Sequence, residues 1–129
     1  MKKITQKWFE FAGNDLRNAE ILFKNKSYEG AIWHCHQAVE KYLKGVLIEI
    51  DKLVSKTHDL PSLLVEVGFG APKEILNFIQ DLNAYYQPSR YPDTALLNPL
   101  SYDRKTANNF LKLTKIIIKW LRYQIHTKK

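Results

Sequence analysis

The strongest constraint in this sequence is the stretch 28–50, where apolar side chains recur in alternating steps of four and three residues. This spacing is typical of a heptad seam, which keeps apolar side chains on one side of an α-helix. Additional apolar residues widen the stripe, so it faces more than one neighbour. The seam consists of Tyr28, Ile32, Cys35, Val39, Tyr42 and Val46. The pattern predicts the central helix of a helical bundle.

Four other stretches are predicted to be helical. Residues 5–24 and 101–125 repeat apolar residues at helical spacing, with Thr5 and Ser101 as expected N-caps. Residues 59–67 form a short helix with Pro61 in its first turn, and residues 72–85 form another. Three prolines between 87 and 100 predict an irregular loop there. Residues 1–129 are therefore expected to form a single all-α domain, an antiparallel four- or five-helix up-and-down bundle.

Charge and composition narrow the class of protein. The chain has 129 residues and a formal net charge of +7, which favours polyanionic partners such as nucleotides or RNA. Its one cysteine, Cys35, has no partner for an internal disulfide and fits a reducing compartment. No apolar run reaches the roughly 18 residues that span a bilayer, and no secretory signal is visible. We predict a soluble cytoplasmic protein without membrane contact.

The central helix carries a run of polar residues that is a candidate ligand-binding face: His36, Gln37, Glu40, Lys41 and Lys44. His36 and Glu40 are four residues apart and share one face, as two metal ligands would. A third ligand is not evident even with the nearby His34, so we predict no metal and no cofactor. A site for a phosphate or a partner, and an ordinary solvated helix face with a Glu40–Lys44 pair, remain the alternatives.

Two further candidate sites lie outside that helix. His58 and Asp59 precede the short helix, where the pair acts in chemistry or simply caps the helix. The loop from 87 to 100 contains Arg90, Tyr91 and Asp93, which follow two tyrosines. An Arg beside aromatic residues contacts a phosphate while a ring stacks on a base, or it pairs with an acid and locks the loop.

The last predicted helix contains the one pair that suggests catalysis. Arg122 and His126 are four residues apart, so His126 is a candidate general acid or base and Arg122 stabilises charge on a phosphate. A basic, solvated helix end explains the same two residues. The sequence has no glycine-rich phosphate loop, no nucleophile elbow and no cysteine cluster. It therefore favours a binding module over an enzyme, and a ribonuclease if it is an enzyme.

Four motifs in order resemble those of the HEPN domain family (higher eukaryotes and prokaryotes nucleotide-binding). They are Asn14-Asp15-Leu16, the run from His36 to Lys44, Thr57-His58-Asp59-Leu60, and Arg90-Tyr91-Pro92-Asp93. The resemblance implies a five-helix, mostly antiparallel bundle that forms homodimers. It also implies a partnership with a small nucleotidyltransferase encoded nearby, for which the domain is a substrate-binding subunit or a toxin held in check.

The sequence departs from this family at the ribonuclease motif. Many HEPN toxins have an Arg and a His separated by four to six residues, whereas Arg122 and His126 are separated by three. We therefore expect a non-catalytic nucleotide- or substrate-binding subunit that acts with a separate nucleotidyltransferase in a toxin–antitoxin-like system. The alternatives are a metal-independent ribonuclease toxin that uses Arg122 and His126, and a structural homodimer without a ligand.

Overall fold

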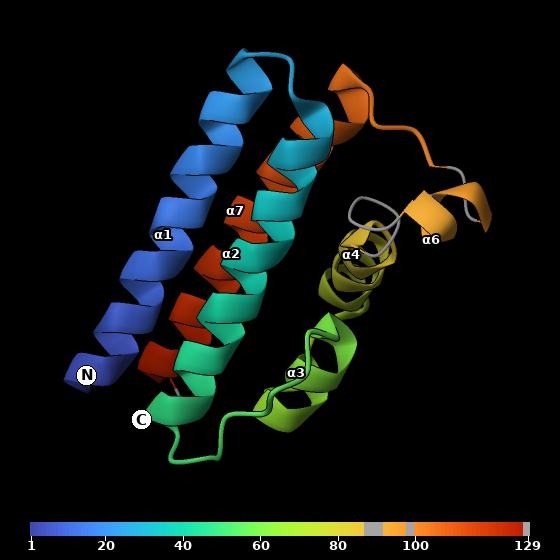
Figure 1. Cartoon of the computed structure of the whole chain (residues 1–129). Coiled ribbons are helices and arrows are strands. Elements are labelled where there is room, and N and C mark those ends of the chain that lie inside the picture. The colour runs from blue at the N-terminus through green and yellow to red at the C-terminus, as the bar shows by residue number, and fades with distance from the viewer. Residues whose placement is uncertain (87–91, 98–99, 128–129) are drawn as a thin grey trace.

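The computed structural model is an all-α bundle and describes residues 1–86, 92–97 and 100–127. In chain order the helices are α1 (Lys3–Lys24), α2 (Tyr28–Glu49), α3 (Leu60–Val67), α4 (Lys73–Ala84), α6 (Pro92–Leu97) and α7 (Arg104–Thr127). Figure 1 shows the three long helices α1, α2 and α7 side by side, with α3 and α4 against α2. The predicted all-α helical bundle is confirmed.

Helices α1 and α2 form a hairpin whose interface is made of small residues. Each helix buries three of them at intervals of seven, which places them on one side: Thr5, Ala12 and Ala19 in α1, and Ala31, Ala38 and Gly45 in α2. At Gly45 the approach is closest, because a Cβ atom there would lie 2.7 Å from the ring of Phe9. Phe9 itself stacks on Tyr42 with ring centroids 3.9 Å apart.

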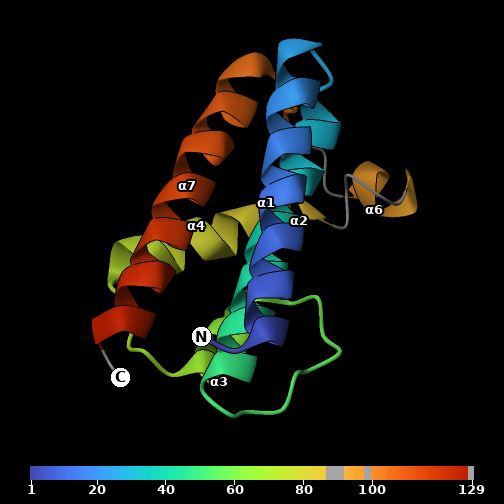
Figure 2. The ribbon, with the colours of Figure 1, turned by 90° about the vertical axis from the view of Figure 1, so that its left-hand side faces the viewer.

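Helix α7 runs parallel to α2 and antiparallel to α1. Arg122, late in α7, reaches Tyr42, late in α2, and Lys115 lies 3.6 Å from Glu20 near the end of α1. Ile117, Leu121 and Ile125 from α7 are fully or nearly fully buried in the core. The return of the chain through α3, α4 and α6 makes this parallel arrangement possible, as the two views in Figures 1 and 2 show.

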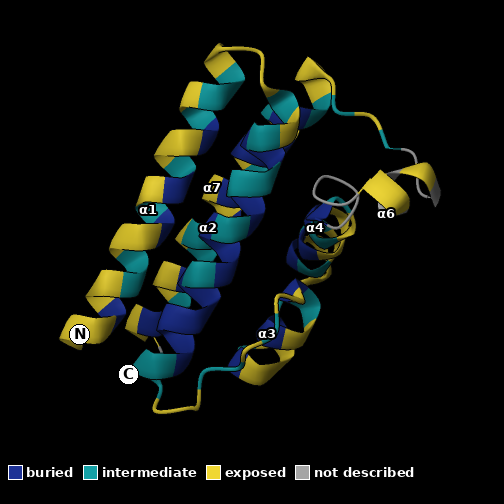
Figure 3. Ribbon diagram, viewed as in Figure 1, coloured by how far each residue is buried: buried dark blue, intermediate teal, exposed yellow. Residues whose placement is uncertain are grey.

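Helices α3 and α4 cover the face of α2 that α1 and α7 leave open. The side chain of Asp59 accepts a hydrogen bond from the backbone N–H of Ser62 and caps α3, and Gly68, in the left-handed conformation with φ 74°, ends it. The buried residues Leu60, Leu63 and Ile79 contribute to the core from this side. Figure 3 shows buried residues in both α3 and α4. No helix in the described ranges is both long and apolar enough to span a membrane.

Three local predictions differ from the structure. Thr5 lies inside α1 and is fully buried, because the helix begins two residues earlier at Lys3. At the start of α7 the cap is Asp103 rather than Ser101, since the carboxylate of Asp103 accepts from the N–H of Thr106 at 2.8 Å. The stretch expected to be irregular contains helix α6, which begins at Pro92, where the fixed φ of proline suits a first helical position.

Candidate functional site

A buried carboxylate, Glu40 on α2, is the centre of a polar cluster between α2, α3 and α4. Glu40 is 5% exposed and Lys44, one turn later, is 7% exposed. The ammonium of Lys44 donates to one carboxylate oxygen at 3.0 Å, and Nδ1 of His58 lies 3.0 and 3.1 Å from the two oxygens. Because a carboxylate only accepts, His58 carries its proton on Nδ1 and presents Nε2 as its other nitrogen.

His36, one turn before Glu40, is fully buried and is held by Asn83 from α4. The backbone N–H of Leu60 donates to Oδ1 of Asn83 at 3.0 Å, which fixes that atom as the amide oxygen. Nε2 of His36 lies 3.3 Å from the same oxygen and must therefore donate. Burial lowers the pKa of His36, and the nearby Glu40 opposes this shift only in part. His36 is thus a neutral, structurally fixed imidazole.

Asp59 connects the cluster to the first turn of α3. One oxygen accepts from the side-chain amide of Asn83 at 2.9 Å, and the other accepts from the N–H and hydroxyl of Ser62. The hydroxyl of Ser62 makes the largest contribution to lowering the pKa of Asp59, so the carboxylate stays ionised. Asp59 therefore acts in the structure as a helix cap that also orients Asn83.

Aromatic rings line the side of the cluster where α4 ends. Tyr86 is buried and stacks on His36 with ring centroids 4.1 Å apart, and it lies 5.9 Å from the ring of His58. The side chain of His58 is 59% exposed, whereas that of His36 is 1% exposed. The cluster thus opens to solvent at His58, and its deeper members hold that imidazole in place.

The structure separates Lys41 from the other predicted residues of α2. Its ammonium donates to Asp15 of α1 at 2.5 Å, and Nδ1 of His34 lies 2.8 Å from the other oxygen of the same carboxylate. Asp15 is 6% exposed, so this network joins α1 and α2 on a different side of α2 from Glu40. The predicted face of five residues is therefore two separate polar networks, and its Glu40–Lys44 part is buried rather than solvated. Gln37 stays near the first network, with its side-chain oxygen 3.4 Å from Nδ1 of His36.

The loop candidates are only partly placed. Arg90 and Tyr91 lie outside the described residues, and Asp93 is exposed in the first turn of α6. In α7, Nε of Arg122 lies 3.4 Å from the hydroxyl of Tyr42, a long hydrogen bond, and His126 is exposed one turn later. Within the described ranges no group of three or more His, Cys, Asp or Glu side chains is arranged to hold a metal ion.

Sequence reasoning missed Asn83, Tyr86 and Asp15 as members of these networks. Asn83 is four residues after the buried Ile79 and therefore lies on the inward-facing side of its helix. A polar residue at such a position indicates a buried hydrogen-bond partner. The partners themselves lie far away in sequence, 47 residues from Asn83 to His36 and 19 from Asp15 to His34. Such pairings depend on how the helices pack and not on local spacing.

The fold and this cluster define a small helical domain whose central helix buries a polar site that opens at one edge. Comparison with known proteins gives the family: the chain belongs to the HEPN domain family, whose model matches residues 5–124. The resemblance found in the sequence motifs is thus confirmed.

Three relatives agree with this assignment. The chain is 28% identical over 123 residues to the protein named "Putative toxin MJ1304" of Methanocaldococcus jannaschii, covering 85% of this chain and 80% of that protein. The crystal structure of TT1696 from Thermus thermophilus is similar with a TM-score of 0.85 and 26% identity, covering 95% of this chain and 99% of that one. The crystal structure of ST0689, an archaeal HEPN homologue, is similar with a TM-score of 0.79 and 28% identity, covering 97% and 99%.

Proposed function

We propose that this chain is a non-catalytic nucleotide-binding subunit that acts with a separate small nucleotidyltransferase in a toxin–antitoxin-like pair. Membership of the HEPN domain family and the similarity to a protein named as a toxin support the toxin–antitoxin context. The nucleotide-binding role is our inference from the geometry of the polar cluster, and the partner is what the family resemblance of the sequence motifs implies.

The observation that carries the proposal is the fixed, exposed imidazole of His58. Its Nδ1 is bound to the buried Glu40, so its ring orientation is set while Nε2 is available at the open edge. The ring of Tyr86 lies beside it. Because Nδ1 donates to Glu40, the free Nε2 accepts, which suits an amino or hydroxyl group of a nucleotide. Arg90 and Tyr91 are the phosphate and base contacts expected from the sequence.

Two buried members of the cluster are poorly placed for catalysis. Glu40 is buried and already accepts hydrogen bonds from Lys44 and His58, so it is poorly placed to reach a substrate as a general base. His36 is buried against Asn83 and Tyr86, away from the open edge. The cluster holds groups in place, as a binding site requires.

Calorimetric titration with purine and pyrimidine nucleoside triphosphates tests the nucleotide half of the proposal. We expect binding by the wild-type chain, weakening of at least about tenfold, or about 1.4 kcal/mol, in His58→Ala, and no change in the control His126→Ala. His126 is also an exposed histidine, but it lies far along α7. Equal affinities of wild type and His58→Ala would place binding elsewhere, and no binding at all would refute the nucleotide role.

Co-expression tests the partner half. The chain should co-purify with a small nucleotidyltransferase encoded beside it, and the complex should persist through size-exclusion chromatography. Light scattering on the chain alone should give the mass of a homodimer, which the family resemblance predicts. A stable complex without nucleotide binding would keep the pairing and reject the binding role. Growth arrest on expression that His126→Ala abolishes would instead favour the ribonuclease alternative.

A further inference from the structure

The direction of each hydrogen bond at the open edge of the polar cluster follows from the contacts of Asn83. Its amide is fixed at both ends, because Oδ1 accepts from the backbone N–H of Leu60 at 3.0 Å and Nδ2 donates to Asp59 at 2.9 Å. Nε2 of His36 lies 3.3 Å from that Oδ1 and therefore donates. Burial lowers the pKa of His36 and keeps the imidazole neutral, so its Nδ1 has no proton and can only accept.

The side chain of Gln37 is the partner of this unprotonated nitrogen. The nearer end of its amide, at Oε1, lies 3.4 Å from Nδ1 of His36. Two acceptors at that distance repel each other, whereas a half-turn of the amide keeps the same shape and brings the NH₂ group to the same position. Asn83 cannot make the corresponding turn without losing both of its own partners. Hydrogen bonding thus assigns the NH₂ group of Gln37 to His36 and turns the carbonyl oxygen of Gln37 away from it.

His58 presents the same kind of atom beside Glu40. Its Nδ1 donates to Glu40, so its exposed Nε2 accepts. Oε1 of Glu40 lies 3.1 Å from Nδ1 of His58 and 3.9 Å from Nδ1 of His36. Gln37 contacts that nitrogen of His36 and is partly exposed, so it belongs to the same edge. The ring of Tyr86 lies beside both imidazoles, and the edge therefore offers two acceptors next to an aromatic ring.

We propose that Gln37 and His58 select a nucleotide whose base carries an exocyclic amino group, such as adenine or cytosine, over the matching oxo bases hypoxanthine and uracil. An amino group has two N–H donors, one for each acceptor of the edge. An oxo group would face these atoms as a third acceptor, and Gln37 cannot turn its amide to meet it, because His36 holds the NH₂ group. This inference rests on the proposed function, since it names the class of nucleotide that the same site takes.

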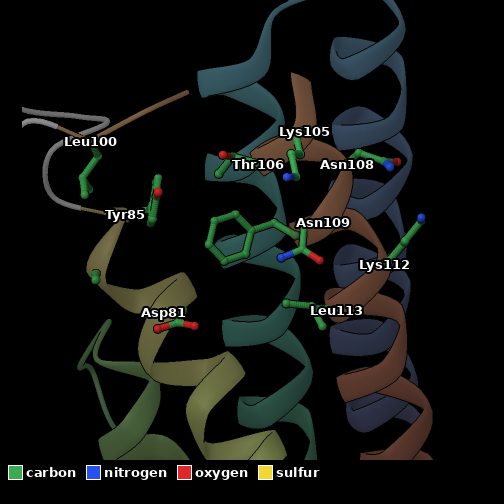
Figure 4. A pocket seen from close by; sticks show the side chains of 11 residues that line it. Asp81, Tyr85, Leu100, Lys105, Thr106, Asn108, Asn109, Lys112 and Leu113 are labelled. Carbon is green, nitrogen blue, oxygen red and sulfur yellow. The ribbon is translucent and has the colours of Figure 1, made fainter. Parts of the chain in front are cut away.

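A second concave surface can hold a base without such a preference. It is the cleft of about 950 Å³ between α4 and α7, which Figure 4 shows with Asp81, Lys105 and Asn109 among its lining residues. These side chains include both donors and acceptors, so a base bound there would be held whether it carried an amino or an oxo group. Selectivity between the two kinds of base therefore distinguishes the polar cluster from the cleft.

Calorimetric titration with two matched pairs of nucleotides tests the proposal. Adenosine triphosphate is compared with inosine triphosphate, and cytidine triphosphate with uridine triphosphate, because the members of each pair differ in the amino or oxo group of the base. The test variant is Gln37→Leu, and the matched controls are Gln80→Leu, an exposed glutamine of α4, and Asn109→Leu in the cleft. Circular dichroism checks that the variants are folded.

We expect the wild-type chain to bind the amino member of each pair at least about tenfold more tightly, because a site built to accept from a donor rejects a ligand that lacks it. Gln37→Leu should reduce this ratio to about threefold or less, and both controls should keep the wild-type ratio. A loss of packing alone would weaken both members equally and leave the ratio unchanged. Nitrogen-15 NMR of the free chain should also show opposite tautomers, with His58 protonated on Nδ1 and His36 on Nε2.

Four results would overturn the inference. Amino and oxo members that bind equally, both weakened by His58→Ala, would keep the proposed function and reject the selectivity. A ratio that Gln37→Leu leaves unchanged would exclude Gln37 as its source, and a ratio that Asn109→Leu abolishes would assign the base to the cleft. A proton on Nδ1 of neutral His36 would refute the orientation of the Gln37 amide. An absence of binding by all four nucleotides would refute the proposed function, and this inference with it.

Discussion

Replacing one member of the buried pair Glu40–Lys44 should destabilise the protein far more than replacing both members with uncharged residues. Both side chains are less than a tenth exposed, and their charged atoms are 3.0 Å apart. Lys44→Met leaves the carboxylate with His58 as its remaining donor, and Glu40→Gln leaves a buried ammonium facing an amide. In the double variant, Gln and Met keep similar volumes and no charge is buried.

The magnitudes follow from the distance and the burial. At 3.0 Å and an effective dielectric of about 20, the attraction is about 5.5 kcal/mol, and the cost of removing two charges from water offsets most of it. Removing one partner of such a pair typically costs about 3–5 kcal/mol. We expect about 3 kcal/mol for Lys44→Met, because His58 still donates a hydrogen bond to Glu40, and about 4 kcal/mol for Glu40→Gln. The double variant should lie within about 2 kcal/mol of the wild type.

Urea unfolding followed by circular dichroism at neutral pH measures these free energies of unfolding. The comparison requires that all four proteins show the same dependence of the free energy of unfolding on urea concentration. The four proteins form a double-mutant cycle, and the expected coupling is several kcal/mol. Losses below about 1 kcal/mol in both single variants would mean that the pair is solvated, contrary to its burial in the structure. A double variant no more stable than the worse single variant would mean that the cluster depends on hydrogen bonds and not on balanced charge.

Three further predictions concern packing, pH and thiol reactivity. Gly45→Ala should lower the free energy of unfolding by about 1–2 kcal/mol, because the new Cβ would lie 2.7 Å from the ring of Phe9. Gly13→Ala, where the nearest atom is 3.7 Å away, should instead raise it by about 0.5–1 kcal/mol, and equal effects of the two variants in urea unfolding would contradict this packing. Burial lowers the pKa of His36 in the folded state, so the unfolded chain binds more protons and the free energy of unfolding should fall as the pH drops through and below 6.5. His36→Gln should make this fall less steep, and an unchanged pH dependence would count against a buried neutral imidazole. Burial raises the pKa of Cys35 to about 12, so an aromatic disulfide reagent should label it at neutral pH only on unfolding; rapid labelling of the native protein would show an open route to the thiol.

Local periodicity was enough to predict the helices other than α6, but not all of their ends. The seam of α2 and the Pro and Gly breaks indicated the number and order of the long helices. The error at Pro92 is instructive, because a cluster of three prolines predicts a loop although Pro92 suits the first position of a helix. Before α7, Ser101 and Asp103 are both residue types that cap helices well. In the structure Asp103 caps the helix, and the hydroxyl of Ser101 donates to Asp103 at 3.1 Å instead of capping.

The candidate site was predictable along one helix and not between helices. His36, Glu40 and Lys44 are spaced by four, so their common face followed from the sequence. Lys41 is one residue after Glu40 and therefore points about 100° away, toward Asp15 on α1. Whether the Glu40 face was buried or solvated depended on α3 and α4, which cover it from residues 60–84. Long-range packing of this kind leaves no signal in the spacing of α2 itself.

The two polar networks of α2 raise the question of why a small bundle buries charge at all. The α1–α2 interface is already specified by small residues and a ring stack, and the core has ample apolar area, so stability does not require Glu40 and Lys44. The pair does, however, fix the orientation of His58 at the open edge. If that is its role, the double variant Glu40→Gln with Lys44→Met should be nearly as stable as the wild type and still bind nucleotide at least about tenfold more weakly. A double variant that is stable and binds normally would show that the cluster only sets the packing of α3 and α4 on α2.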